Sequence, residues 1–475
     1  MNRDIDAEAQ AEARTENAER IAGQVLDAAR RAVGGSADVD VNVAHEHMAL
    51  TRFANSYIHQ NVASDTDTVT LRIHVDGRTT VNSTTLTDEA GLAALVERTI
   101  AAVRVSPADP GWAGLSGFAE LPKLTAAPDL ATGLAAPEVR AEQVKAYVEA
   151  VGDLTAAGFA RNRMVVTAYA NSAGQAVTGT VVEAVVDGIA KTATSDGASR
   201  QASRLITDLD AAALGARARA KAQASQDPVE IEPGEYEVVL EPTAVSDVLW
   251  ILGGFGFNGK AFTEGTSFVQ LGKAQFDASV TLVDDPLSGP AAGAVFDAEG
   301  TPRDRLTLVR DGETVAVVHD RRSAREAGVA STGHADAESA VHGAEPINLR
   351  LEPSAGAAPS EVEGPAADSS VLALVANVRR GLLVTDHWYT RCLDPRRLVM
   401  TGLTRNGVWL IENGEITRPV KNLRFTQSYP EALAPGRVLG IGGHAPAFAS
   451  KYGVQSAMAP ALRLAGWNFT GGASG

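Results

Sequence analysis

Two long segments of alternating apolar and polar residues constrain the fold of this chain more than any other feature. They cover residues 37–62 and 68–86, and read ADVDVNVAHEHMALTRFANSYIHQNV and TVTLRIHVDGRTTVNSTTL. Successive side chains of a strand point to opposite faces, so this alternation predicts strands. A second pair of long strands is predicted over 161–194, around the turn Asn171-Ser172-Ala173-Gly174. The first half of the chain therefore contains extended β-structure.

Helices are predicted on either side of these strands. Residues 4–33 carry Ile21, Val25 and Ala29 at helical spacing, and Thr87-Asp88 can cap a helix that runs through Val103. Further helices are predicted over residues 138–157 and 208–225. The Pro- and Gly-rich residues 105–137 predict a connector across the surface.

The organisation changes near Pro233-Gly234, beyond which the sequence is rich in predicted strands. Residues 322–368 are small and polar, which predicts long, partly mobile loops. We expect an α+β protein with an N-terminal α/β region followed by a larger β-rich C-terminal domain. Its expected parts are an N-terminal α/β domain (1–104), the connector (105–137), a middle α/β segment (138–228) and the β-rich C-terminal domain (229–475).

Composition excludes several partner classes. The formal net charge is −16 and the arginine pairs are scattered, so a nucleic-acid partner is not expected. No apolar run approaches the roughly 18 residues of a membrane span, and the polar start lacks a hydrophobic signal core. Cys392 is the single cysteine, which excludes an intrachain disulfide and fits a reducing compartment. These features predict a cytoplasmic protein with no membrane partner.

The segment VSDVLWILGGFGFNG contains Gly254-x-Gly256-x-x-Gly259, the glycine spacing of a dinucleotide-binding loop. Such a loop requires a strand before the glycines and a helix after them. Here an apolar helical stripe from Val245 to Leu252 precedes the glycines. The segment therefore predicts the end of a helix and a turn, not a nucleotide site.

A metal site is suggested only by His45-Glu46-His47, with His59 and His74 on neighbouring segments. On a strand, His45 and His47 share one face, so their imidazoles could converge on one ion, while Glu46 points to the other face. The alternative is a pair of histidines on a strand surface.

Other reactive residues have structural interpretations. Asp284-Asp285 is followed by a proline, which favours a turn over an acid–base pair. Cys392 lies among strand residues without a charge cluster that would form a thiolate, which favours a buried structural cysteine. The chain has no G-x-S-x-G, H-E-x-x-H or C-x-x-C motif.

Several segments together resemble the TldD/PmbA (also TldD/TldE) family of modulator-of-gyrase-type peptidases, in order along nearly the whole chain. These segments are LTRFANSYIHQN (50–61), LRIHVDGR (71–78), VVLEPTAVSDVL (238–249), EGTSF (264–268), VTLVDDP (280–286), INL (347–349) and HWYTRCLDPRRLVMTGLTRNGVWLIENGEITRPVKNLRFTQS (387–428).

The resemblance implies a specific role. In that family, an active subunit carries a His-Glu-x-x-x-His motif on the helix after the VVL strand, with a later cysteine completing a zinc site. A sister subunit, TldE or PmbA, lacks these ligands and pairs with the active one. Here Trp250, Ile251 and Phe255 stand at the three motif positions, and the tail contains no cysteine. No catalytic or metal-binding residue is expected in this chain, and zinc is expected in a TldD-like partner.

The resemblance therefore implies the non-zinc subunit of a TldD/TldE-type metalloprotease heterodimer that processes unfolded peptides, inactive by itself. Thr404 and Arg405 in GLTRNG could line a peptide chamber, and the alternative is a hairpin at Asn406-Gly407 with exposed flanks. Two other functions stay open. One is a stand-alone peptide-binding or regulatory homodimer, and the other is a peptidase with a metal at His45 and His47.

Overall fold

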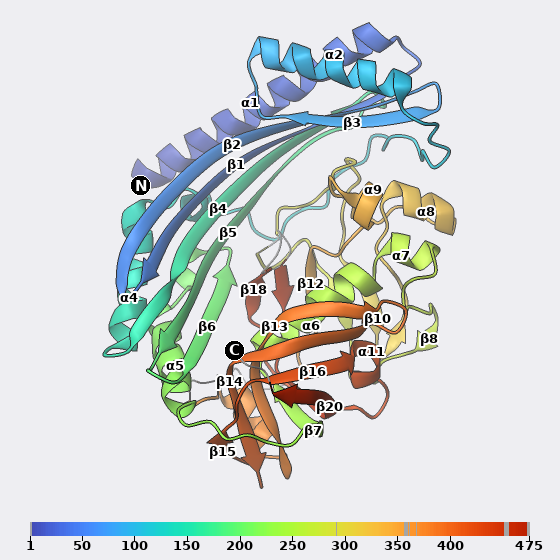
Figure 1. Ribbon diagram of the computed structural model, residues 1–475. Helices are drawn as coiled ribbons and strands as arrows, with labels where there is room; N and C mark the ends of the chain where they lie inside the picture. Colours follow the sequence, from blue (N-terminus) through green and yellow to red (C-terminus); the bar gives the residue numbers. More distant parts are fainter. Residues whose placement is uncertain are drawn as a thin grey trace.

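A computed structural model describes residues 2–290, 292–355, 360, 362–366, 368–450 and 456–472 of the chain (Figure 1). Long, curved N-terminal strands carry helices on their outer side, and a β-rich C-terminal domain lies on their inner side. The protein is thus α+β, as predicted. Among the described residues, no helix combines the length and apolar character needed to cross a membrane.

The N-terminal sheet has six antiparallel strands in the order β3-β2-β1-β4-β5-β6. Their bounds are β1 Asp38–Ala54, β2 Tyr57–Val75, β3 Arg78–Thr84, β4 Thr155–Asn171, β5 Ala176–Lys191 and β6 Asp196–Ser203. Since β1 pairs with both β2 and β4, the first α/β segment and the middle segment share one sheet. The sequence did not predict β6, because DGASRQAS has no large apolar residue to reveal a strand.

Helices cover the outer face of this sheet. They are α1 Asn2–Val33, α2 Glu89–Val105, α3 Leu130–Gly133, α4 Pro137–Val151 and α5 Ala211–Ala224, with a 3₁₀ turn at Ile206–Asp208. Ile21 and Val25 of α1 pack on Val39 and Val41 of β1, and each fully buried aliphatic side chain contributes roughly 1.5–3 kcal/mol.

The structure agrees with one local prediction about these helices and corrects another. The predicted cap of α2 is confirmed, because the Asp88 side chain accepts a hydrogen bond from the Gly91 N–H at 2.7 Å. Helix α4 ends at Val151 rather than near 157, because Gly152 takes a left-handed φ of 70° and β4 starts soon after.

The C-terminal domain contains a β-barrel and a second sheet. In the barrel, the strands follow the order β13-β7-β20-β16-β14, and additional pairing between β13 and β14 closes it. Strand β15 extends from β14, and β17 pairs with β20. The bounds are β7 Gly234–Leu240, β13 Arg380–Asp394, β14 Val399–Glu412, β15 Glu415–Pro419, β16 Leu423–Ser428, β17 Val438–Ile441 and β20 Leu462–Gly472.

The second sheet follows the order β18-β19-β12-β9-β10-β11-β8. Its strands are β8 Lys273–Ala274, β9 Leu282–Asp284, β10 Leu306–Arg310, β11 Glu313–Thr314, β12 Asn348–Leu351, β18 Ala447–Ala449 and β19 Ser456–Met458. Short helices connect the strands: α6 Pro242–Ile251, α7 Gly259–Thr263, α8 Arg321–Ala327, α9 Ser339–His342, α10 Ser369–Val375 and α11 Tyr429–Ala432. The predicted loop region 322–368 thus contains most of α8 as well as α9 and β12, and residues 356–359, 361 and 367 lie outside the described residues.

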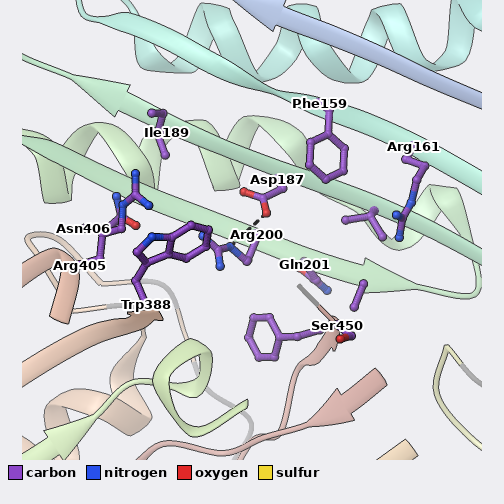
Figure 2. Close-up of a pocket in the computed structure, with 13 residues that line it drawn as sticks. Phe159, Arg161, Asp187, Ile189, Arg200, Gln201, Trp388, Arg405, Asn406 and Ser450 are labelled. Atoms are coloured by element: carbon purple, nitrogen blue, oxygen red, sulfur yellow. Dashed lines mark ion pairs between the residues drawn. The ribbon is translucent and has the colours of Figure 1, made fainter. Parts of the chain in front are cut away.

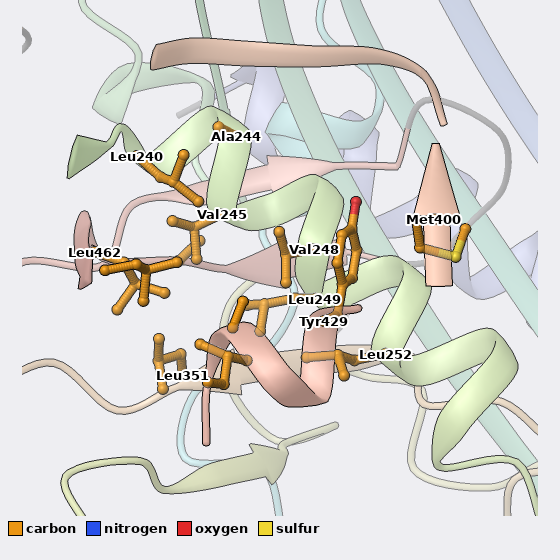
Figure 3. Close-up of a cluster of buried hydrophobic side chains, with 14 of the residues drawn as sticks. Leu240, Ala244, Val245, Val248, Leu249, Leu252, Leu351, Met400, Tyr429 and Leu462 are labelled. Atoms are coloured by element: carbon orange, nitrogen blue, oxygen red, sulfur yellow. The ribbon is translucent and has the colours of Figure 1, made fainter. Parts of the chain in front are cut away.

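Helix α6 lies in the core of the C-terminal domain. Val245, Val248 and Leu249 are buried and belong to one cluster with Tyr429 and Leu462 of the barrel region (Figure 3). The helix follows β7 directly along the chain. Apolar packing on several sides fixes its position between the barrel and the second sheet.

Candidate functional site

Cavities separate the inner face of the N-terminal sheet from the C-terminal domain. The sheet cavity, about 360 Å³, lies between β4–β6 and residues of β13, β14 and β18 (Figure 2). Its lining consists of Phe159, Arg161, Val185, Asp187, Ile189, Arg200, Gln201, Trp388, Arg405, Asn406, Phe448, Ala449 and Ser450. The barrel cavity, about 540 Å³, is lined by residues 194–196, 225, 228, 388–389, 403–407 and 420–422. Trp388, Arg405 and Asn406 line both cavities.

Ion pairs connect the two sides of the sheet cavity. Arg200 of β6 contacts Asp386 of β13 at 3.0 Å and Asp187 of β5 at 3.2 Å. Burial opposes the charge of Arg200, but the two carboxylates outweigh it and hold the pKa of Arg200 above its ordinary value. Arg161 of β4 pairs with Glu183 of β5. The cavity is therefore lined with charged side chains, and the pair between Arg200 and Asp386 joins β6 of the sheet to β13 of the barrel.

Arg405 and Thr404 occupy different environments at this site. The Arg405 guanidinium lies over the Trp388 ring, 4.6 Å from its centroid. The Thr404 side chain is buried, and its hydroxyl accepts a hydrogen bond from the Leu423 N–H at 2.9 Å. Thr404 thus joins β14 to the start of β16, while Arg405 remains exposed to the two cavities.

The hairpin considered at Asn406-Gly407 is wrong. Both residues lie inside β14, where Val408 pairs with Val384 and Arg405 pairs with Asp386, so two residues of β14 oppose one of β13. Asn406 takes a left-handed φ of 60°, and its side-chain amide donates to Asp196 of β6 at 2.9 Å. The bulge explains the Asn-Gly pair, since these residues tolerate positive φ.

Trp250, Ile251 and Phe255 stand at the positions of the zinc motif in the resemblance to the TldD/PmbA family. They lie around the end of α6. Trp250 and Ile251 are half-buried and pack against the main core, whereas Phe255 is 42% exposed. None of them lines the sheet cavity or the barrel cavity. The indole N–H of Trp250 is buried without a hydrogen-bond partner among the described residues. Because these side chains offer no lone pair to a metal, a zinc ion does not fit this helix end.

The glycine-rich segment after α6 is not a phosphate-binding loop. Residues Leu252–Gly256 continue α6 as one π-helical turn, and Gly259 begins the short helix α7. A Cβ at Gly256 would lie 2.3 Å from the Phe268 ring, and one at Gly259 would lie 2.4 Å from His319 Nδ1. The glycines allow close packing within the domain. The sequence predicted that these glycines end a helix. In the structure the helical turns continue to Gly256, and Gly259 begins the next helix.

His45 and His47 face α1 on the outer side of the sheet. His45 Nδ1 lies 2.8 Å from Asp67, and His47 Nδ1 lies 3.0 Å from Asp65, which also contacts Arg14 of α1. Glu46 points to the inner face and pairs with Arg163 at 2.5 Å, as the strand alternation implied. Within the described ranges, no three His, Cys, Asp or Glu side chains are grouped to hold a metal ion.

His59 and His74 are remote from that pair, because they lie near opposite ends of β2. The His74 ring stacks on Trp112 with 4.7 Å between centroids. Cys392 is half-buried rather than fully buried, and burial raises the pKa of its thiol. This shift disfavours the nucleophilic thiolate.

Sequence reasoning missed a buried carboxylate–imidazole pair. Asp284, the last residue of β9, lies 2.9 Å from His334 Nε2 and accepts the Asn348 N–H at 2.8 Å. Its neighbour Asp285 accepts the Leu287 N–H and stabilises a turn, as predicted for the pair. His334 also lines a cavity of about 200 Å³ against the sheet. Nothing in the sequence around His334 indicates its partner, which is 50 residues away.

Three solved structures are similar to this chain over nearly its whole length. TldE from Thermococcus kodakarensis has a TM-score of 0.81 at 16% identity, and the match covers 95% of this chain and 100% of that one. A candidate modulator of a DNA gyrase from Thermotoga maritima has a TM-score of 0.78 at 17% identity, with 95% and 100% covered. A candidate modulator of DNA gyrase from Bacteroides thetaiotaomicron has a TM-score of 0.76 at 18% identity, with 95% and 98% covered. At these identities the similarity shows a shared fold.

Family profiles give a more direct assignment. The profile of the PmbA/TldA metallopeptidase domain 1 matches residues 39–103, and that of the PmbA/TldA metallopeptidase C-terminal domain matches residues 233–471. No curated protein sequence matches the chain. The C-terminal match alone spans half of the 475 residues, in the part that contains the barrel and α6. The chain therefore belongs to the TldD/PmbA family.

Proposed function

We propose that this chain is the TldE-like, non-zinc subunit of a metalloprotease complex that processes unfolded peptides. One observation carries the proposal: the motif positions are Trp250, Ile251 and Phe255, and the first two pack against the core of the C-terminal domain. A zinc-dependent subunit requires imidazole or thiolate ligands with an open coordination position, and this helix supplies neither. The similarity to a solved TldE supports the same assignment.

The cavities suggest what such a subunit contributes. An extended peptide exposes backbone groups at every residue and side chains on alternate sides, so it requires a long surface with polar and apolar groups. The sheet and barrel cavities adjoin at Trp388 and together offer aromatic rings, arginines and amides. We infer that they form part of a chamber that admits unfolded segments, with Arg405 at its wall.

Co-purification with a TldD-like protein from the same organism tests the proposal. We expect the isolated chain, prepared without a metal-affinity tag, to contain no stoichiometric zinc and to leave unfolded peptides intact. Mixed with the partner, it should form a complex that survives gel filtration, because specific heterodimers bury at least about 1,200 Å². Zinc should enter with the partner, and addition of this chain should increase peptide cleavage.

The same preparation separates the alternatives. About one zinc per isolated chain, lost on His45→Ala or His47→Ala substitution, would instead identify a metallopeptidase that uses these histidines. A stable homodimer that neither co-elutes with the partner nor changes its activity would favour a stand-alone peptide-binding or regulatory protein. His59→Ala is a matched control, since His59 lies on β2, apart from the His45 and His47 pair.

A further inference from the structure

Arg405 has unused hydrogen-bonding capacity at the junction of the sheet and barrel cavities. Arg200 is flanked by Asp187 and Asp386, and Arg161 pairs with Glu183. Arg405, in contrast, lies over the Trp388 ring and makes no hydrogen bond or ion pair with the described residues. Figure 2 shows Arg405 and Trp388 opposite the charged residues of the sheet. The guanidinium edge of Arg405 is therefore available to a ligand.

The surroundings of Arg405 preorganise it. The guanidinium lies over the Trp388 ring, with Cζ 4.6 Å from the ring centroid, and this cation–π contact restricts the side chain. The bulge at Asn406, held by the hydrogen bond to Asp196, fixes the backbone beside it. An arginine held in this way loses little side-chain entropy when it binds, and its planar fork matches the two oxygens of a carboxylate.

Arg161 provides a further donor beside the sheet cavity. Its Nε atom is buried and has no hydrogen-bond partner among the described residues, whereas the Nε atom of Arg200 lies 3.2 Å from Asp187. Phe159, Trp388 and Phe448 form the apolar part of the same lining. The cavity thus combines unused guanidinium donors with aromatic surface, which suits a carboxylate next to an apolar group.

The charges around the cavity disfavour a polyanion. Asp187, Glu183 and Asp386 lie near the arginines and would repel additional negative groups. The chain also has a net charge of −16, which opposes nucleic acids and polyphosphates in general. Arg405 makes no ion pair with the described residues, so the site has capacity for one monovalent anion.

We propose that the Trp388–Arg405 stack is a recognition site for a carboxylate of an extended peptide, with an adjacent apolar residue against Phe159 and Phe448. The peptide as ligand rests on the proposed function, whereas the carboxylate preference follows from the cavity itself. The carboxylate comes either from the C-terminus of the peptide or from an Asp or Glu side chain. A binding assay with matched peptides distinguishes these two sources.

The assay measures fluorescence anisotropy of a labelled, unstructured heptapeptide that ends in phenylalanine, using the full chain without any partner. One pair of peptides differs in a free or amidated C-terminus. A second pair, both amidated, differs in a central Glu or Gln. We expect one charged peptide to bind at least about tenfold more tightly than its neutral match, the factor that corresponds to about 1.4 kcal/mol. A preference within the first pair identifies the C-terminal carboxylate, and one within the second identifies a side chain.

Substitutions assign the preference to Arg405. R405Q should reduce the ratio of the affinities for the charged and the neutral peptide to about one. Its affinity for the neutral peptide should stay the same, which also shows that the variant is folded. R405K keeps a charge but loses the planar fork, so it should retain only part of the preference. R418Q is the matched control, because Arg418 is exposed on β15 and lines neither cavity.

Three outcomes would overturn the inference: no peptide binds, wild type shows no charge preference, or R405Q retains it. Each is independent of complex formation. If the chain fails to co-elute with a TldD-like partner but prefers carboxylates through Arg405, the subunit proposal fails and the recognition site stands. If the complex forms but the chain shows no preference for carboxylates, the recognition site fails and the subunit proposal stands.

Discussion

At the scale of single residues, the buried ion pair between Lys221 of α5 and Glu241 joins the N-terminal α/β region to the start of α6. Both side chains are almost completely buried. Burial lowers the pKa of Lys221 and raises the pKa of Glu241, so each charge depends on the other to remain ionised. We expect Lys221→Met to lower the free energy of unfolding by about 3–5 kcal/mol, because it leaves Glu241 without its partner.

The matched double variant Lys221→Met/Glu241→Gln distinguishes an unpaired charge from lost packing. It removes both charges, so it should recover much of the stability that the single variant loses. Urea denaturation followed by circular dichroism gives both values. Equal losses in the single and double variants would contradict this explanation, because the double variant has no unpaired carboxylate.

At the scale of an element, α6 and the helical turn after it test the proposal that this chain binds no zinc. We expect the triple variant Trp250→His, Ile251→Glu, Phe255→His to show neither stoichiometric zinc nor peptidase activity, since it lacks a third ligand and residues that orient the imidazoles. It should also lose roughly 2–4 kcal/mol of stability, because Trp250 and Ile251 pack against the core and a glutamate would be placed there.

The single variant Phe255→His is the control within the same element. Phe255 is 42% exposed, so this change should cost about 0.5 kcal/mol or less. Elemental analysis, thermal denaturation and a peptide-cleavage assay measure the three properties. A stable triple variant with one zinc per chain and zinc-dependent cleavage would contradict our interpretation of this helix.

At the scale of the whole molecule, Glu299 links the C-terminal domain to the sheet. Its carboxylate lies 3.2 Å from Arg72 of β2 and accepts the Arg321 N–H at 2.9 Å, and its backbone carbonyl accepts the Ser116 hydroxyl of the connector. Burial, reinforced by the negative charges of Asp297 and Asp320 and offset in part by Arg72, raises the pKa of Glu299 from 4.5 to about 7.

This shift predicts a pH dependence of stability. Between about pH 4.5 and 7 the folded state holds a proton on Glu299 that the unfolded state releases. The resulting contribution to stability is fully present below pH 4.5 and is lost as the pH rises through 7. From pH 5 to 8, the stability of Glu299→Gln should therefore increase relative to wild type in urea denaturation. Glu142→Gln changes an exposed residue of α4, so its free energy of unfolding should vary with pH in the same way as that of wild type. If Glu299→Gln also varied with pH in the same way as wild type, the assignment of the shift to Glu299 would be refuted.

Features that depend on local periodicity and capping could be predicted from the sequence. The alternation in 37–62 and 68–86 correctly indicated β1, β2 and β3, and Asp88 correctly marked the start of α2. It also placed His45 and Glu46 on opposite faces of β1. These properties follow from the geometry of one segment, whose side chains alternate or recur at a fixed period whatever the rest of the chain does.

Features that bring distant segments together could not be predicted from the sequence, because they form only in the folded chain. Closure of the barrel through β13 and β14, the Asp284–His334 pair and the recruitment of β6 as an edge strand depend on pairing between separate parts of the chain. The bulge that places Arg405 over Trp388 also arises only when β14 pairs with β13, although Asn406-Gly407 looks like a hairpin turn in isolation. Long-range hydrogen bonding and burial select among locally acceptable conformations, so the same two residues form a turn in one context and a bulge in another.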